Sequence, residues 1–317
     1  SSDLSTTHMD IKSAALTLKQ GQLVAFPTET VYGLGVDAEN LQALNRMYEV
    51  KGRPKDHPVI VHIGNIEELD YWAKEIPAYA RALAEKFWPG PMTLLLPRTK
   101  HALDAITGGQ EIVGIRFPSH PIAQELLREF HRLGGHGIAA PSANRFGNVS
   151  PTSAEDVVEE LGDFLGEEDL IIDGGDCQVG IESTIIDCTG DAPRIVRLGA
   201  ITKEMIEEVI EIRDLQSNST IRASGTLPRH YSPRAKVLID QVPVKGQGMI
   251  ALSGQSTPSG VMRLASPETI EDYAHDLYGA LRKADAEGLR EICVFLPEGD
   301  GLAEAIRDRV MRAASEG

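Results

Sequence analysis

The sequence predicts an α/β protein built from two domains and a linker. Short apolar runs with the β-branched content of buried strands alternate with segments of helical periodicity over most of the 317 residues. The composition changes over residues 214–235, which are rich in Ser, Thr, Pro and Arg and are typical of a linker. We therefore expect a larger domain over residues 9–213 and a small parallel α/β domain over residues 236–317.

The larger domain begins with a helix that Asp10 can cap and that Gly21 closes. Further amphipathic segments predict helices at 40–50, 65–72, 77–87, 121–131, 153–161 and 203–210. Apolar runs between them predict strands at 22–26, 58–63, 92–96, 112–118, 137–140, 170–172, 181–187 and 194–201.

The small domain shows the same alternation of element types. Strands are expected at 235–240, 248–253 and 291–297, and helices at 267–287 and 302–314. The segment contains no GxGxxG and no Walker lysine, so its residues alone predict no function.

A cluster of cations follows the helix at 40–50, in the stretch KGRPKDHP. Lys51, Arg53 and Lys55 are spaced two apart, and we expect Gly52 and Pro54 to keep the segment extended. Successive alternate residues of an extended chain point the same way, so the three cations would face one side and repel. This pattern indicates an anion site, although a solvated basic turn is an equally good interpretation of the cluster alone.

Small polar or charged groups also stand at the ends of several predicted strands. The strand in GIAAPSAN ends at Ser142 and Asn144, IVGIR ends at Arg116, and Ser183 opens the strand at 181–187. Such groups can bind the phosphate and ribose of a nucleotide, but they are also common in ordinary turns, where they bond locally.

The linker carries more than a spacer needs. It contains the sequence RHYSP, with Tyr231 among basic residues, and an exposed flexible segment gains little from an aromatic ring unless it docks. We therefore expect the segment around Tyr231 to dock on the first domain instead of acting as a passive spacer.

The totals restrict the function classes. The formal net charge of −16 opposes broad, salt-driven binding to nucleic acid, so stable nucleic-acid binding is not expected and a basic patch would suit a small anionic ligand. The three cysteines form no CxxC pair, which predicts a reduced compartment. No apolar run has membrane-spanning length, and the first nine residues do not have the pattern of a signal peptide, so we expect a cytoplasmic protein.

Several stretches together resemble one family. FPTETVYGLG, KGRP, the strand ending at Arg116, PSAN and IESTIID occur in the order found in the YrdC family. The RHYSP linker and the small α/β domain resemble the long, two-domain form of that family's L-threonylcarbamoyladenylate synthases. The resemblance covers nearly all of the chain after Met9 and implies a twisted α/β sheet around a concave cavity, plus a small Rossmann-like domain.

The resemblance also implies an activity. Members of this form are nucleotidyltransferases that make L-threonylcarbamoyl-AMP and pyrophosphate from L-threonine, bicarbonate and ATP. The product serves threonylcarbamoyladenosine modification of tRNA, so the implied downstream partner is the tRNA threonylcarbamoyl transferase machinery. Mg²⁺ is the implied cofactor, held mainly by the ATP phosphates, with no metal site on the protein.

Site residues follow by position from the same resemblance. Lys51 and Arg53 would act on the phosphates in catalysis, and threonine would lie among Thr30, His62, Arg116 and Ser183. The remaining ATP contacts would be His57, Ser142, Asn144, Ser150, Arg197 and Tyr231. His57 departs from the family pattern, which often has Asn there.

Two other functions are alternatives. A carbamoyltransferase of hydrogenase maturation carries a similar domain, but it would bring zinc-finger cysteine pairs, which this sequence lacks. A non-catalytic RNA-binding module could use a basic concave face, but the net charge of −16 opposes it.

Overall fold

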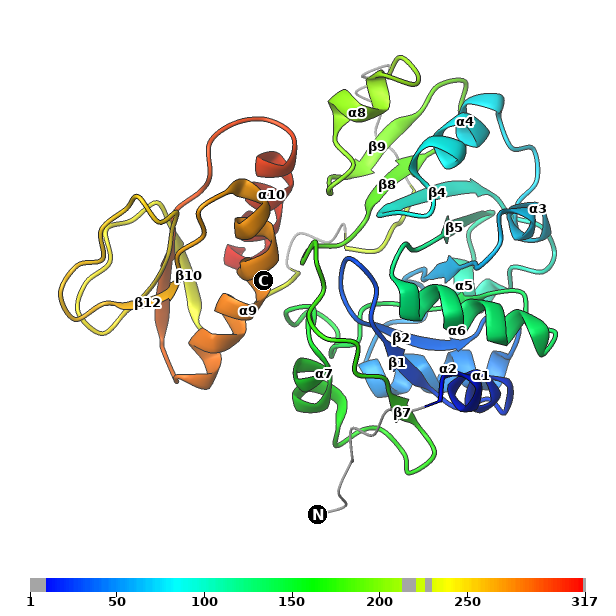
Figure 1. Ribbon diagram of the computed structural model, residues 1–317, viewed down its shortest axis with the longest axis horizontal. Coiled ribbons are helices and arrows are strands. Elements are labelled where there is room, and N and C mark those ends of the chain that lie inside the picture. The colour runs from blue at the N-terminus through cyan, green and yellow to red at the C-terminus, as the bar shows by residue number, and fades with distance from the viewer. Residues whose placement is uncertain (1–9, 213–220, 226–229, 316–317) are drawn as a thin grey trace.

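The structure is a computed structural model that describes residues 10–212, 221–225 and 230–315. Within these residues, a large mixed sheet carries helices on its faces, and a smaller parallel sheet with two helices lies beside it (Figure 1). The predicted α/β class with a second, smaller domain is confirmed.

The large sheet has the strand order β7-β1-β2-β6-β3-β5-β4-β8-β9. Its strands are β1 (Val24–Phe26), β2 (Gly33–Asp37), β3 (Ile60–His62), β4 (Met92–Pro97), β5 (Ile112–Arg116), β6 (Ile138–Ala139), β7 (Leu170–Ile171), β8 (Thr184–Asp187) and β9 (Arg194–Arg197). Three neighbouring pairs of this sheet are parallel (β1 with β7, β3 with β5, β4 with β8), and the other five are antiparallel. Strands from distant parts of the chain thus lie side by side.

The helices of the larger domain agree with the predicted amphipathic segments. They are α1 (Ile11–Lys19), α2 (Leu41–Lys51), η1 (Ile66–Glu68), α3 (Leu69–Trp72), α4 (Ala78–Phe87), α5 (Asp104–Thr107), α6 (Pro121–Arg132), α7 (Ala154–Leu161) and α8 (Lys203–Glu207). Asp10 caps α1 by accepting from the Lys12 amide, and Ser153 forms a capping box with Asp156 on α7. The short helix α5 lies in a segment predicted as a loop.

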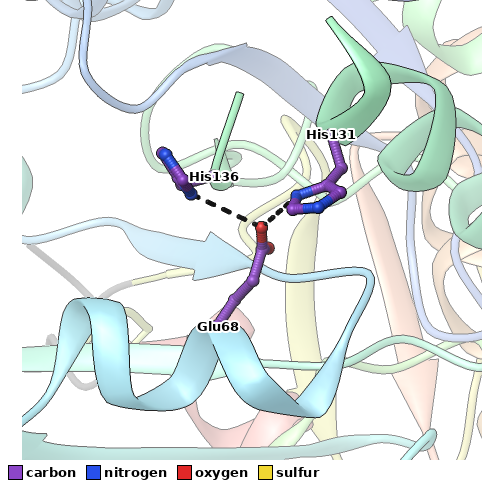
Figure 2. A group of neighbouring side chains, drawn as sticks. All are labelled: Glu68, His131 and His136. Atoms are coloured by element: carbon purple, nitrogen blue, oxygen red, sulfur yellow. Dashed lines mark hydrogen bonds and ion pairs between the residues drawn. The ribbon is translucent and has the colours of Figure 1, made fainter. Parts of the chain in front are cut away.

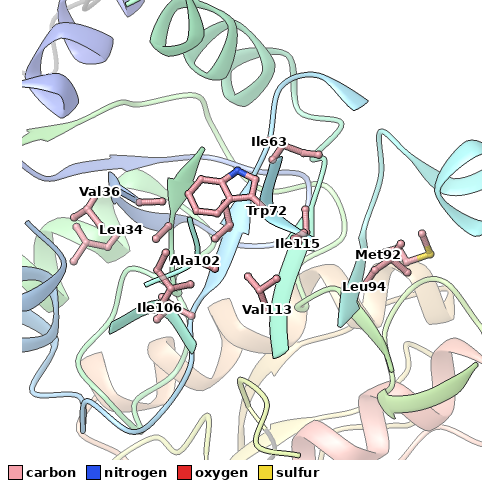
Figure 3. Packing of buried hydrophobic residues seen from close by; sticks show 14 of the residues in the cluster. Leu34, Val36, Ile63, Trp72, Met92, Leu94, Ala102, Ile106, Val113 and Ile115 are labelled. Atoms are coloured by element: carbon pink, nitrogen blue, oxygen red, sulfur yellow. The ribbon is translucent and has the colours of Figure 1, made fainter. Parts of the chain in front are cut away.

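The large sheet separates two hydrophobic clusters, because side chains alternate along each strand. Val24 and Phe26 of β1 pack with α1 and α6 on one face. Leu23 and Ala25 belong to the larger cluster on the other face, whose middle includes Trp72 and Ile115 (Figure 3).

The small domain has a parallel sheet in the order β10-β13-β11-β12. Its elements are β10 (Lys236–Ile239), β11 (Gly248–Ile250), β12 (Met262–Ala265), α9 (Ile270–Ala286), β13 (Glu291–Val294) and α10 (Leu302–Ala314). Both helices lie on the side of this sheet that faces the larger domain (Figure 1). Val31, Val149 and Ile181 of the larger domain share one hydrophobic cluster with them, so the two domains are packed together.

Two strands were not predicted from the sequence. Residues 33–37 form β2, although two of its five residues are glycines. A Cβ at Gly35 would lie 2.8 Å from side-chain atoms of both Ile138 and Phe26, so close packing of β6 and β1 explains the glycine. The edge strand β12 has a partly exposed, mixed composition, which gives it little strand signal.

The predicted arrangement of the three cations in KGRPK is wrong. Lys51 is the last residue of α2, because Gly52 in the left-handed conformation ends the helix one residue later than expected. Lys51 and Arg53 are buried, whereas the exposed Lys55 donates to the Asn45 side chain. The three side chains therefore do not share one face.

Two further observations concern the cysteines and the helices. Cys177, Cys188 and Cys293 are all free and buried. In the part of the chain that the structure describes, no helix is both long and apolar enough to cross a membrane.

Candidate active site

A cavity of about 50 Å³ lies where the larger domain, including the residues just before β8, meets the linker. Its wall includes Glu182 and the described linker residues Ser224, Gly225 and His230. Most of the predicted site residues also line it: Thr30, Arg53, His62, Arg116, Ser142, Ser183, Arg197 and Tyr231.

Arg116 stands at the end of β5 on the floor of the cavity. Its guanidinium forms an ion pair with Glu29 and donates to Thr30 Oγ1 at 2.9 Å, and its Nε has no hydrogen-bond partner among the described residues. Burial raises the pKa of Glu29, but the charge of Arg116 and the hydrogen bonds to the carboxylate outweigh it and leave the pKa below its ordinary value. Glu29 thus fixes the orientation of Arg116 and remains ionised.

His62 lies on β3 beside Arg116, since β3 and β5 pair with His62 opposite Arg116. His62 is 4% exposed, and its Nδ1 has no hydrogen-bond partner in the part of the chain that the structure describes. Burial, reinforced by the charge of Arg116, lowers its pKa to about 3. The imidazole is therefore neutral at physiological pH and has a nitrogen free to bond a ligand.

Arg53 and Arg197 also line the cavity. Arg53 donates to the Pro58 carbonyl at 2.8 Å, and Arg197 donates to the carbonyls of Ser183 at 3.0 Å and Ser224 at 2.9 Å. Burial lowers the pKa of both, that of Arg53 to about 10. In the described residues neither forms an ion pair, so carbonyl and hydroxyl oxygens alone accept their hydrogen bonds.

Four predicted site residues do not line the cavity. The Lys51 ammonium is buried against the carbonyls of Ser142 and Asn144, and its pKa lies well below the ordinary value because of that burial. The Asn144 side chain donates to backbone carbonyls, and Ser150 Oγ donates to Glu182. His57 is half-buried, with 23% of its side chain exposed, and packs edge-on against Phe146. Their roles as ATP contacts stay predictions.

The linker covers one side of the cavity. Tyr231 is 1% exposed, has a positive φ of 60°, and stacks on Tyr278 of α9 with ring centroids 5.6 Å apart. The neighbouring His230 is also buried, and burial lowers its pKa to about 3. Residues 213–220 and 226–229 of the linker lie outside the described residues.

Glu182 connects the cavity to the small domain. It accepts hydrogen bonds from Ser150, from the Tyr278 hydroxyl at 2.8 Å and from Arg309 Nε at 2.9 Å. Burial raises its pKa, but Arg309 and Arg197 outweigh that effect and keep the pKa below its ordinary value. The fully buried Arg309 also donates to the Leu198 carbonyl and lies over the Tyr231 ring at 5.3 Å. The small domain therefore contacts both Glu182, which lines the cavity, and Tyr231 of the linker.

Three of these contributors were not predicted as site residues. Glu29 and Glu182 lie within the motifs FPTETVYGLG and IESTIID, but their arginine partners are 87 and 127 residues away in the chain. Arg309 lies on an ordinary amphipathic helix. His230 could have been included, since it stands next to Tyr231 in the linker motif.

Comparisons with known proteins agree with this geometry. The Sua5/YciO/YrdC family model, described as telomere recombination, matches residues 16–199, and the model described as threonylcarbamoyl-AMP synthase, C-terminal domain, matches residues 201–315. A protein named threonylcarbamoyl-AMP synthase from Pyrococcus abyssi is 42% identical over 96% of this chain and 94% of its own length. One of the same name from Bacillus subtilis is 38% identical over 98% of this chain and 95% of its own length.

A solved structure adds the fold. The crystal structure of P. abyssi Sua5 complexed with L-threonine has a TM-score of 0.85 and 39% identity, and covers 96% of this chain and 94% of that chain. The fold and motifs define a YrdC-type α/β protein. The chain belongs to the Sua5/YciO/YrdC family, and its second matched domain places it with the long, two-domain members.

The contact between Glu182 and Arg309 can be tested by Arg309→Met. We expect the free energy of unfolding to fall by about 3–5 kcal/mol, because the change leaves a buried carboxylate without its cation. Urea denaturation measures the loss, and Arg307→Met on the same helix is the matched control, since Arg307 only donates to the Pro297 carbonyl. Equal losses in the two variants would contradict a special role for the buried pair.

Proposed function

We propose that this protein is a threonylcarbamoyl-AMP synthase. The observation that carries the proposal is a cavity with three arginines on its wall, only one of which, Arg116, has a carboxylate partner among the described residues. Such a cavity favours an anionic ligand, and both a nucleoside triphosphate and an amino-acid carboxylate are anionic. Family membership supports the same activity, and P. abyssi Sua5 has been crystallised as a complex with L-threonine.

Threonine would bind on the floor of the cavity. The Arg116 guanidinium would take the carboxylate, with Glu29 holding its orientation. Thr30, Ser183 and the neutral His62 offer hydroxyl and imidazole groups to the amine and hydroxyl of the substrate. The neutral form of His62 suits this role. A protonated imidazole would add a second cation beside Arg116 and would repel a protonated substrate amine.

ATP would bind on the side formed by Arg53, Arg197 and Ser142. The threonine amine takes up bicarbonate-derived carbon dioxide to give a carbamate, whose oxygen attacks the α-phosphorus while pyrophosphate leaves. The fixed arginines would stabilise the charge that develops on the phosphate oxygens. Lys51 donates to the carbonyls of Ser142 and Asn144, so we propose that it acts mainly by fixing this phosphate-facing segment.

Mg²⁺ is compatible with these residues as a metal held by the substrate. The two carboxylates nearest the cavity, Glu29 and Glu182, are both paired with arginines. Mg²⁺ would therefore rest on phosphate oxygens and water, and would supply charge neutralisation.

We further propose that the linker closes the cavity over both substrates. Ser224, Gly225, His230 and Tyr231 line the cavity, and exclusion of water would protect an adenylate that hydrolyses easily.

We also propose that the product passes to the tRNA threonylcarbamoyl transferase machinery in the cytoplasm. A carbamoyltransferase or an RNA-binding module is not favoured, since the chain matches the two-domain synthases over almost its full length.

The reaction itself gives the first test of the function. Release of pyrophosphate from ATP should require both threonine and bicarbonate, because the carbamate is the nucleophile. A pyrophosphate assay with single omissions, combined with mass spectrometry of the adenylate, measures this. Equal release without threonine would refute the synthase assignment.

The phosphate role of Arg53 is tested by Arg53→Ala. We expect kcat/KM for ATP to fall roughly 10–100-fold, because a hydrogen bond to a charged group contributes about 1.5–3 kcal/mol. Lys55→Ala is the control from the same segment, since Lys55 is exposed and bonds only to Asn45 among the described residues. Wild-type rates in the Arg53 variant would remove this residue from the site.

The carboxylate role of Arg116 is tested by Arg116→Lys, which keeps the charge but loses the two-pronged guanidinium. The KM for threonine should rise more than the KM for ATP, because only the threonine carboxylate uses both prongs. Arg81→Lys, at a surface pair with Asp70, is the matched control. An unchanged KM for threonine would contradict the assignment.

A further inference from the structure

A group of three metal-ligating side chains lies outside the cavity, where the α6–β6 connection meets the turn after β3. Glu68 ends η1, His131 is in the last turn of α6, and His136 precedes β6. Nδ1 of His131 lies 2.6 Å from Glu68 Oε1, and Nδ1 of His136 lies 3.7 Å from the same oxygen. Figure 2 shows both rings directed at that oxygen from different elements.

We propose that Glu68, His131 and His136 form a binding site for a divalent transition metal of the Zn²⁺ type. Two imidazole nitrogens and one carboxylate oxygen are a common ligand set for Zn²⁺ and related borderline metals, and such three-ligand sites keep a position for water. Mg²⁺ and Ca²⁺ prefer oxygen ligands only, so this site differs in chemistry from the metal that accompanies ATP.

The distances suit a metal after small side-chain movements. The three ligand atoms lie within 4.8 Å of one another. Zn–N and Zn–O bonds of about 2.0–2.2 Å place tetrahedral ligand atoms roughly 3.4 Å apart. No pair therefore needs a change larger than about 1.4 Å, which rotations of two partly exposed imidazoles can supply.

The backbone and its neighbours hold the ligands in this arrangement. His131 and His136 are separated by four residues, and the left-handed Gly134 (φ 80°) reverses the chain between them. The His136 ring stacks on Tyr71 with centroids 3.9 Å apart, and its carbonyl accepts from the indole of Trp72. His136 is therefore positioned by packing that does not depend on the metal.

The buried carboxylate of Glu68 favours a bound cation. Glu68 is 6% exposed, and its ion-pair partners in the described residues are only these two imidazoles, neither of which is a permanent cation. A divalent ion would neutralise the buried carboxylate and join α6 to η1, and would thereby brace the paired strands β3 and β6.

The experiment measures Zn²⁺ binding to the full chain, purified with chelator and without ATP or threonine. We expect one Zn²⁺ per chain by calorimetry, a rise in Tm on adding Zn²⁺, and visible absorption of a Co²⁺-substituted sample from low-symmetry coordination. His131→Ala, His136→Ala and Glu68→Gln should each weaken binding at least about 10–100-fold, the size of effect seen when even a second-shell partner is lost. Their folding is checked by circular dichroism.

His101→Ala is the matched control. His101 stacks on the other face of Tyr71, with centroids 3.9 Å apart, but it is not one of the three ligands. This variant should bind Zn²⁺ like the wild type. Absence of stoichiometric binding, or binding that survives both His131→Ala and His136→Ala, would overturn the proposal and leave a hydrogen-bonded carboxylate and imidazole. Loss of Zn²⁺ binding in the His101→Ala variant, with binding retained in the three ligand variants, would also overturn it.

Discussion

The central physical constraint in this protein is the burial of more positive than negative charge around one cavity. Lys51, Arg53, Arg116 and Arg197 are each at most 8% exposed. Glu29 and Glu182 are the buried carboxylates that face them, and Glu182 is shared with Arg309. Buried cations are tolerated only with hydrogen-bond partners, which explains why backbone carbonyls converge on Lys51 and Arg197. The remaining imbalance favours an anionic substrate.

This constraint also gives the small domain a physical role. Arg309 and Tyr278 reach across the domain boundary to Glu182, and they contact Tyr231 of the linker as well. A movement of the linker away from the cavity would separate Tyr231 from both partners. The position of the linker and the electrostatic environment of Glu182 are therefore coupled, because Arg309 and Tyr278 contact both Tyr231 and Glu182.

The sequence predicted the elements that have strong local patterns and failed where a long-range contact decides. Strands rich in branched residues and helices such as α10, with a clear apolar stripe, were predicted within a few residues. The strand β2 was not, since its glycines make sense only beside Ile138 and Phe26. For the site, the resemblance supplied Arg116 and His62, but local pattern could not predict that Glu29 pairs with Arg116. The spacing of Lys51, Arg53 and Lys55 led to a wrong prediction of their arrangement, because helix α2 continues to Lys51.

The same balance of charge explains why two histidines belong in a cavity that is already cationic. Burial and the surrounding positive groups lower the pKa of both His62 and His230 to about 3. At physiological pH each ring adds hydrogen-bonding capacity without adding charge. Each also has an Nδ1 atom with no hydrogen-bond partner among the described residues, although both rings are nearly inaccessible to solvent. Leaving a buried polar atom unpaired costs on the order of 1–3 kcal/mol, so these atoms are best explained as positions that a bound substrate satisfies.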